Sequence, residues 1–323
     1  MIALSSLVLA VSMGALPADP PTTLQIRETV QRSIPYIEEQ GQWWITKKKC
    51  VSCHRGGNMV WSLALAKRNG FEVSQKLDEW FDWAVDKSLS KNDKGKIVGL
   101  GNKEGVAQIL LSLDPSNLKP HQIDTQNKLA ALLRNGQQAD GSWKPGGQLP
   151  SQKRPITETA SVSTMWLTLT LLVASNSPEG SQAVERAMKY IKQSTPGKSI
   201  EWYALRLLLS VQTKDAKLRA EFVKKLRSQQ KPDGGWGWMV TDESDALGTG
   251  LALYALLRAG LDSNDQAIKR AQQFLVSTQR DDGSWPVKGT KEKKKNNVEE
   301  TAVYWGTTWA AVSLIESLPK ESE

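Results

Sequence analysis

Three copies of a short Gln–Gly–Trp pattern recur between residues 138 and 285 of this 323-residue chain. The last two tryptophans are 49 residues apart, and the first two are 93 apart, close to twice that interval. A period of this length is typical of proteins built by repeating one supersecondary unit. One degenerate copy is therefore expected between the first two, where Tyr190-Ile191-Lys192-Gln193 leads to Trp202. The three clear copies are Gln138-Ala139-Asp140-Gly141-Ser142-Trp143, Gln230-Lys231-Pro232-Asp233-Gly234-Gly235-Trp236 and Gln279-Arg280-Asp281-Asp282-Gly283-Ser284-Trp285.

Each copy connects two predicted helices. Residues Ala267 to Thr278 show the first kind, an amphipathic helix with apolar side chains at helical spacing, which the following Asp-Gly turn ends. More apolar helices follow the copies, at Ala160 to Ala174, Trp202 to Val211, Leu247 to Ala259 and Thr301 to Leu318. Gly70 and Gly260 are expected to end helices as C-caps.

The first third of the chain shows the same repeat of paired helices, but less regularly. Two further helical hairpins are expected there, and Gln42-Trp43-Trp44 takes the place of the Gln–Trp element in the first of them. Strand patterns are absent, so the sequence predicts an all-α fold of about six hairpins. Because one hairpin cannot bury its own apolar face, the hairpins should form a closed helical barrel or an open solenoid. The four helices concerned are Thr29 to Gln40, Asn58 to Asn69, Val73 to Leu89 and Glu104 to Leu113.

The repeated elements resemble the QW motifs of the squalene/hopene cyclase and oxidosqualene cyclase family. That resemblance implies an α/α toroid, with an inner and an outer ring of helices, over residues 24–319. It also implies that each Gln helps to cap a helix while the Trp stacks over it and holds neighbouring hairpins together. The pairs expected to do so are Gln138 with Trp143, Gln230 with Trp236, and Gln279 with Trp285.

The acid that starts cyclisation in this family has no direct counterpart here. Bacterial squalene cyclases carry a D-x-D-D-T-A run before an inner helix, and the corresponding run is Asp242-Glu243-Ser244-Asp245-Ala246-Leu247. The resemblance places Ser244 at the position of the proton-donating Asp, and a hydroxyl is far too weak an acid to protonate an alkene. Asp242 and Asp245 remain as candidates for a displaced acid.

An acidic residue lies at or near the start of nearly every predicted inner helix. If these helices run parallel, their N-termini open on one rim, and Glu158 and Glu300 join Asp242 and Asp245 as catalytic candidates. The helix dipole alone also favours acids in a first turn, by about 0.3–1 kcal/mol each, without any ligand. The alternative is a rim site for a cation, a metal or a polar substrate. The five acids are Glu104, Glu158, Glu201, Asp245 and Glu300.

Aromatic residues gather on or beside the same helices. They could line a cavity, where their π faces stabilise cations, or they could simply fill the core. The residues are Trp61, Trp166, Trp202, Tyr203, Tyr254, Trp305 and Trp309.

Both cysteines of the chain lie in one five-residue stretch, Cys50-Val51-Ser52-Cys53-His54. This CxxCH spacing is the one used for covalent c-type haem, in which two thiols bind the vinyl groups and the histidine ligates the iron. We therefore expect haem c on Cys50 and Cys53, with His54 as proximal ligand. A disulfide or redox dithiol, or half of a zinc site, remain as alternatives.

The sixth iron ligand has several candidates. Met59 follows His54 too closely to reach the distal face, and His121 is expected at the surface. Met239, on the proposed rim, is the remaining candidate. A methionine ligand would favour electron transfer, whereas an open position would favour ligand binding or peroxide chemistry.

The N-terminal residues indicate export. Residues 1–18 read as a signal peptide, with an apolar stretch from Met1 to Ala15 that is too short to span a bilayer. No later segment was expected to cross a membrane, so the mature chain should be periplasmic or otherwise extracytoplasmic. The net charge of +8 is concentrated in two runs, Lys47–Lys49 and Lys288–Lys295, which read as solvated loops and not as a nucleic-acid surface.

Three functional hypotheses follow. The first is an exported haem c protein on a single toroid, acting in electron transfer with a redox partner or as a redox enzyme on a hydrophobic or polar small molecule. The second is a terpene-cyclase-like or isoprenoid-binding protein in which Cys50 and Cys53 form a disulfide. The third is a non-catalytic binding or scaffold module, which a filled central cavity would favour.

Overall fold

The computed structural model describes residues 19–51, 55–174 and 177–319, so the predicted signal peptide, Cys53 and His54 lie outside the described residues. Within these ranges the chain forms twelve α-helices and three short 3-10 helices, with isolated β-bridges and no strand. The α-helices are α1 (Thr23–Lys48), α2 (Gly56–Arg68), α3 (Leu77–Leu89), α4 (Lys103–Ser112), α5 (Pro120–Asn135), α6 (Ile156–Ala174), α7 (Pro178–Gln193), α8 (Ile200–Gln212), α9 (Ala216–Gln229), α10 (Ala246–Arg258), α11 (Gln266–Thr278) and α12 (Glu300–Glu316). The 3-10 helices are η1 (Val98–Gly101), η2 (Leu149–Ser151) and η3 (Glu292–Lys294).

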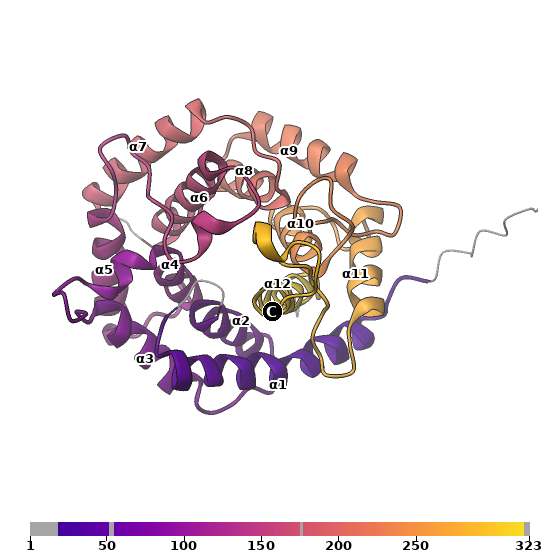
Figure 1. The fold of residues 1–323 in the computed structure, drawn as a ribbon. Helices are drawn as coiled ribbons and strands as arrows, with labels where there is room; N and C mark the ends of the chain where they lie inside the picture. The colour runs from indigo at the N-terminus through magenta and orange to yellow at the C-terminus, as the bar shows by residue number, and fades with distance from the viewer. Residues whose placement is uncertain (1–18, 52–54, 175–176, 320–323) are drawn as a thin grey trace, which may run out of the picture.

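The helices form two concentric rings (Figure 1). The even-numbered helices make the inner ring, in which each packs against the next and α12 packs back against α2. The odd-numbered helices surround them, and α11 meets α1 where the outer ring closes. The all-α toroid expected from the sequence is therefore confirmed in its closed form, as opposed to an open solenoid.

The inner helices lie close to their predicted positions. Each is apolar around much of its circumference because it contacts both the outer ring and the axis, and this made them easy to recognise. Gly70 and Gly260 follow α2 and α10 with φ of +74° and +89°, as expected of residues that end helices.

The first outer helix was predicted too short. The interpretation of Gln42-Trp43-Trp44 as a Gln–Trp element is wrong, because these residues continue α1. A capping box between Thr22 and Gln25 starts this helix, and it runs to Lys48; the next residue, Lys49, caps it in a left-handed conformation with φ of 50°. No Asp-Gly turn stands before Lys49 to end the helix earlier.

The three tryptophans of the repeat make the same contacts in each hairpin. The indole N–H of each donates to a carbonyl ten residues earlier, near the end of the preceding outer helix: Trp143 to Leu133, Trp236 to Leu226 and Trp285 to Leu275, all at 2.8 Å. The backbone N–H of each Trp also donates to a threonine hydroxyl of the following inner helix: Thr164, Thr249 and Thr307. All three indoles are fully buried. Each Trp thus joins the two helices of its own hairpin.

The glutamines join each hairpin to the next outer helix. Gln230 Nε2 donates to the carbonyl of Gly234 within its own turn and to that of Ala267 in α11, both at 2.8 Å. Gln279 Nε2 donates likewise to Gly283 and to Thr29 of α1, at 3.0 and 2.9 Å. This last bond joins the end of the chain to its beginning across the seam of the ring.

In the first copy the bridging residue is Gln137, so the assignment to Gln138 was wrong by one position. Gln137 Nε2 donates to Gly141 at 3.0 Å and to Ala183 of α7 at 2.8 Å. Gln138 is exposed, and its side chain accepts a bond from the Ser142 hydroxyl within the same turn. A constant spacing of six residues between Gln and Trp, as in the other two copies, would have selected Gln137 from the sequence.

The glycine of each turn also packs on the next outer helix. Gly141, Gly234 and Gly283 have φ of +87°, +91° and +81°. A Cβ added to Gly283 would lie 2.1 Å from the carbonyl oxygen of Arg32 in α1, and one on Gly234 would lie 2.5 Å from that of Arg270 in α11. Both the backbone conformation and the close approach therefore require glycine.

The expected degenerate copy keeps the hairpin without the Trp contact. Trp202 lies in the first turn of α8, and not in the loop before it, and its indole N–H has no hydrogen-bond partner among the described residues. The chain between α7 and α8 lacks the Asp-Gly turn that positions the other three tryptophans.

One inner helix is apolar enough to resemble a membrane span. By length and composition alone, α6 could cross a bilayer, although no segment after residue 15 was expected to. In the structure, 67% of the most apolar 18-residue stretch of α6 is buried inside the ring. The helix is therefore apolar because it belongs to the core.

A paired substitution tests the corrected glutamine. Gln137→Ala removes both bonds to main-chain carbonyls and should lower the free energy of unfolding by about 1–2 kcal/mol, as measured by urea denaturation. Gln138→Ala should change it by less than about 0.5 kcal/mol, as is usual for an exposed residue. The reverse order would support the original assignment.

Candidate functional site

The starts of the inner helices share one rim of the toroid, as predicted. Arg55, which precedes α2, pairs with Glu300 at the start of α12, and Glu104 of α4 accepts a bond from Ser163 of α6. The loop before α8 pairs with the loop before α10 through a β-bridge between Ser199 and Met239. The rim therefore holds the residues on which the functional hypotheses depend.

Three of the five predicted rim acids are buried and bonded to a neighbouring inner helix or its loop. Glu158 accepts from the backbone N–H groups of Lys198 and Ser199 at 2.9 and 2.8 Å. Glu201 accepts from the Arg154 guanidinium at 2.7 Å and from the Trp166 indole at 2.8 Å. These contacts give the acids a structural role around the ring, in addition to their favourable position in the helix dipole.

The Arg154–Glu201 pair is the most deeply buried ion pair among the described residues. Its side chains are 1% and 2% exposed. Arg154 also lies over the Trp238 ring, 5.2 Å from its centroid. Removing one member of such a pair leaves an uncompensated buried charge, which is strongly destabilising. Arg154 could not be recognised from the sequence, because no local pattern marks an arginine whose partner lies 47 residues away.

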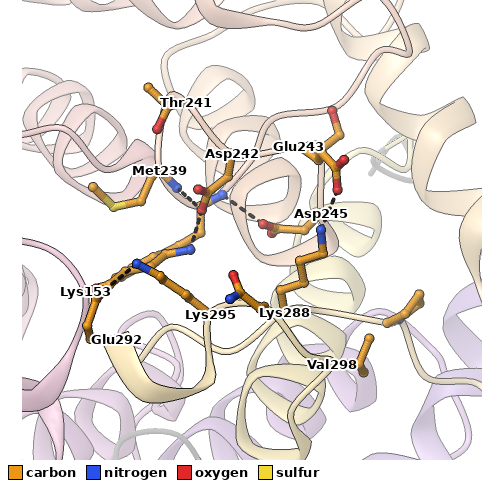
Figure 2. A pocket seen from close by; sticks show the side chains of 14 residues that line it. Lys153, Met239, Thr241, Asp242, Glu243, Asp245, Lys288, Glu292, Lys295 and Val298 are labelled. Carbon is orange, nitrogen blue, oxygen red and sulfur yellow. Dashed lines mark hydrogen bonds and ion pairs between the residues drawn. The ribbon is translucent and has the colours of Figure 1, made fainter.

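A rim cavity of about 590 Å³ lies between the loops that enter α10 and α12 (Figure 2). It contains three of the residues singled out by the sequence, Met239, Asp242 and Asp245. Its volume is that of a small-molecule site, but its walls are unusually rich in charge. The lining also includes Lys153, Trp238, Glu243, Ser244, Lys288, Glu292, Lys295 and Val298.

The charges of this cavity are paired with one another. Lys153 Nζ lies 2.7 Å from Asp242, and Lys288 Nζ lies 2.7 Å from Glu243, as Figure 2 shows. Lys295 is paired with Glu292. The Asp242 carboxylate, a candidate for the displaced acid, is thus engaged in an ion pair with Lys153.

Ser244, at the cyclase acid position, is part of the turn that precedes it. Its hydroxyl donates to Asp233 Oδ1 at 2.7 Å, and the same oxygen accepts the Gly235 N–H at 3.0 Å. The structure thus gives this serine a turn-stabilising contact with a carboxylate.

Asp245 is the N-cap of α10. Its carboxylate accepts from the backbone N–H of Gly248 at 2.7 Å and of Trp238 at 2.9 Å. Desolvation raises the pKa of Asp245 to about 6, against the opposing effect of these two bonds. A carboxyl with this pKa can exchange a proton near neutral pH, so Asp245 is the titratable group of the cavity.

The axis beneath the rim is filled by aromatic side chains. Trp61 of α2 contacts the rings of Trp166, Tyr254 and Trp309, at centroid distances of 6.3, 6.2 and 5.2 Å. We call these four side chains the aromatic plug. The cavity on its rim side has a volume of only about 20 Å³, room for about one water molecule. The core-filling interpretation of these aromatics is thus the one that the structure supports for the axis.

Only part of the CxxCH motif lies within the described residues. Cys50 is exposed, and its backbone carbonyl accepts a bond from the Trp44 indole at 3.0 Å. Desolvation raises the pKa of the Cys50 thiol above its usual value, with Lys87 acting in the opposite direction. Among the described residues no group of three or more His, Cys, Asp or Glu side chains could hold a metal ion.

The residue after the motif is firmly anchored. Arg55 is fully buried, and its guanidinium lies 4.6 Å from the Tyr304 ring centroid and 5.4 Å from that of Trp44. It pairs with Glu300, whose own side chain is 65% exposed. The start of α2 is thereby tied to α1 and α12. No local sequence pattern pointed to this arginine.

Of the proposed iron ligands, Met59 is fully buried and packs close to Gly41 in α1, and His121 is exposed in the first turn of α5. The surface position expected for His121 is confirmed. Met239 lies on the rim, in the wall of the 590 Å³ cavity. Its role as a distal ligand stays a prediction.

Comparisons with known proteins agree with this architecture. The model of the squalene-hopene cyclase N-terminal domain matches residues 198–279. Lanosterol synthase from Mus musculus is 44% identical over 57 residues, which are 18% of this chain and 8% of that protein. The terpene cyclase/mutase ntnI from Nectria sp. is 37% identical over 101 residues, 30% of this chain and 13% of that protein.

Solved structures extend the likeness to almost the whole chain. The type II terpene cyclase MstE from Scytonema has a TM-score of 0.58 at 13% identity, covering 93% of this chain and 99% of its own. The fold is a terpene-cyclase-like α/α toroid. A possible GH105-family member from Salmonella enterica has a TM-score of 0.64 at 12% identity and covers 98% and 99%. At these identities the structural likeness shows the fold alone.

The pKa of Asp245 predicts a pH dependence of stability. Because it rises from 3.8 to about 6 on folding, the native state binds more protons than the unfolded state between these values. The contribution of this group to the free energy of unfolding should therefore fall as the pH rises from about 4 to about 6, by up to about 3 kcal/mol.

Urea denaturation of the wild type and of Asp245→Asn over this pH range measures that contribution. Asn preserves the N-cap and cannot titrate, so the stability of the wild type relative to the variant should decline with pH. Parallel curves for the two proteins would show that the pKa of Asp245 is not raised.

Proposed function

We propose that this protein is an exported c-type haem protein in which a packed toroid carries the cofactor on its rim and serves electron transfer. The CxxCH motif carries the proposal, together with the place of its described flanks. Lys49 ends α1, and the buried Arg55 leads into α2, so the motif joins two fixed points at the rim. Cys50 is exposed, as a thiol that forms a thioether with a porphyrin must be.

The chemistry of the described residues fits haem attachment better than a redox dithiol. Reactive cysteines of dithiol enzymes have a lowered pKa, whereas the pKa of Cys50 is raised. Lys47, Lys48 and Lys49 are close in sequence and offer cations for propionate groups. A haem bound through Cys50, Cys53 and His54 would supply one-electron redox chemistry, and Met239 is the proposed sixth ligand.

The filled axis favours electron transfer over a redox reaction inside the toroid. A substrate chamber usually needs about 300–1,000 Å³, and the rim-side axial cavity has about 20 Å³. The ring would then act as a rigid support that holds the motif and presents it to a redox partner. The proposal thus combines the haem c protein expected from the CxxCH motif with the scaffold role expected of a filled toroid.

Expression of the complete chain with a c-type maturation system tests the proposal. The intact mass should correspond to the chain cleaved near residue 18 plus one covalent haem, with a haem c pyridine haemochrome spectrum. Cys50→Ser should abolish the two-thioether spectrum, and the neighbouring change Lys49→Ser should preserve it. A mature protein without covalent haem would refute the proposal.

A terpene-cyclase-like or isoprenoid-binding protein is the second candidate, because the matched relatives are cyclases and share the toroid. Ser244 is bonded to Asp233 and Asp242 is ion-paired, so Asp245, whose pKa is raised to about 6, is the acid that such an enzyme would have to use. Incubation with squalene and shorter polyprenyl substrates tests it. Product formation that persists when both cysteines are replaced by serine would favour this candidate over haem chemistry.

A further inference from the structure

The opposite end of the toroid axis opens into a second cavity, of about 210 Å³, which none of the functions above uses. All six inner helices contribute to it near their C-terminal ends. The last residues of four of them stand at its edge: Arg68 of α2, Gln212 of α8, Arg258 of α10 and Glu316 of α12. The cavity therefore lies on the ring axis, on the far side of the aromatic plug.

The interior of this cavity is apolar. Trp61, Trp166 and Tyr254 from the plug form part of its lining, and leucines such as Leu65 and Leu208 form the sides. Aromatic and aliphatic walls with a few polar groups at the edge are typical of small-molecule sites. At about 210 Å³ the cavity is smaller than most such sites, so it suits a short chain and not a triterpene.

The two arginines at the edge differ in their partners. Arg258 pairs with Glu316 at 3.1 Å. Arg68 donates through Nη1 to the carbonyl of Ser112 at 2.7 Å and has no carboxylate within ion-pair distance among the described residues. Arg68 is an exposed residue at the edge of the cavity. Desolvation lowers the pKa of its guanidinium, and the nearby Asp114 acts in the opposite direction. The remaining donors of the guanidinium are suited to an anion.

We propose that this cavity binds a short amphipathic anion, with the apolar chain on the aromatic residues and a carboxylate head on Arg68. The competing explanation is that Arg68 only balances the negative end of the α2 dipole. Lys67, the preceding residue in the same last turn, provides the matched control, because it carries the same charge but does not line the cavity.

Isothermal titration calorimetry with octanoate, octan-1-ol and octyltrimethylammonium tests the proposal on the full-length protein. Octanoate should bind most tightly. Arg68→Gln should weaken octanoate by about tenfold and leave octan-1-ol unchanged, since charge-assisted hydrogen bonds are worth roughly this much. Lys67→Gln should change octanoate affinity by less than about twofold.

A cavity-filling variant locates the site independently of charge. Val211→Trp places a bulky ring in the cavity wall and should abolish binding of both octanoate and octan-1-ol. Leu24→Trp, at a residue that is 65% exposed on α1, should leave both unchanged. Equal effects of Arg68→Gln and Lys67→Gln, tighter binding of the cationic probe, absence of binding, or binding that survives Val211→Trp would each overturn the proposal.

Discussion

The fold depends on hydrogen bonds that a repeated Gln and Trp make to main-chain groups of neighbouring helices. The last carbonyls of an α-helix have no partner within the helix, and in a packed ring water cannot reach all of them. The Trp285 indole satisfies one such carbonyl at the end of α11, while its backbone N–H reaches Thr307 of α12. Gln279 then reaches forward to α1. One short turn thus joins the outer helix, the inner helix and the next hairpin.

Closure of the ring determines where chemistry can occur. With α12 packed against α2, the inner-helix N-termini meet on one rim and their side chains converge on the axis. The axis is narrow enough for four aromatic rings to fill it, so it offers no large chamber on the rim side. What remains accessible is the rim itself, with Cys50 and the charged cavity around Asp242, and the smaller cavity at the opposite end.

Much of this architecture could be predicted from local patterns. The inner helices were recognisable because they are apolar on most sides, and the Asp-Gly turns because each requires a glycine with positive φ. The length of α1 could not be predicted, because no helix-breaking residue marks its end. A single copy of the repeat does not distinguish Gln137 from Gln138 as the bridging residue. The distinction appears only when the Gln-to-Trp spacing of all three copies is compared.

The partners of the rim acids were beyond sequence reasoning for a different reason. Glu201 and Arg154 are 47 residues apart and meet where successive hairpins stack, whereas Arg55 and Glu300 are 245 apart and meet only because the ring closes. The sequence singles out these acids because they lie at the starts of predicted inner helices, and the helix dipole explains why acids are favoured there. Their bonds to neighbouring hairpins are a property of the assembled toroid. Likewise, the composition of an inner helix does not reveal whether its aromatics line a chamber or fill it.

Hydrogen exchange of the indole N–H groups tests ring closure most directly. In a ¹⁵N-labelled protein transferred to D₂O, the signals of Trp143, Trp236 and Trp285 should persist together and exchange only through global unfolding, because all three make the same buried bond. If Trp285, whose hairpin is joined to α1 through Gln279, exchanges well before the other two, the last hairpin opens separately from the rest and the account of a closed toroid is wrong.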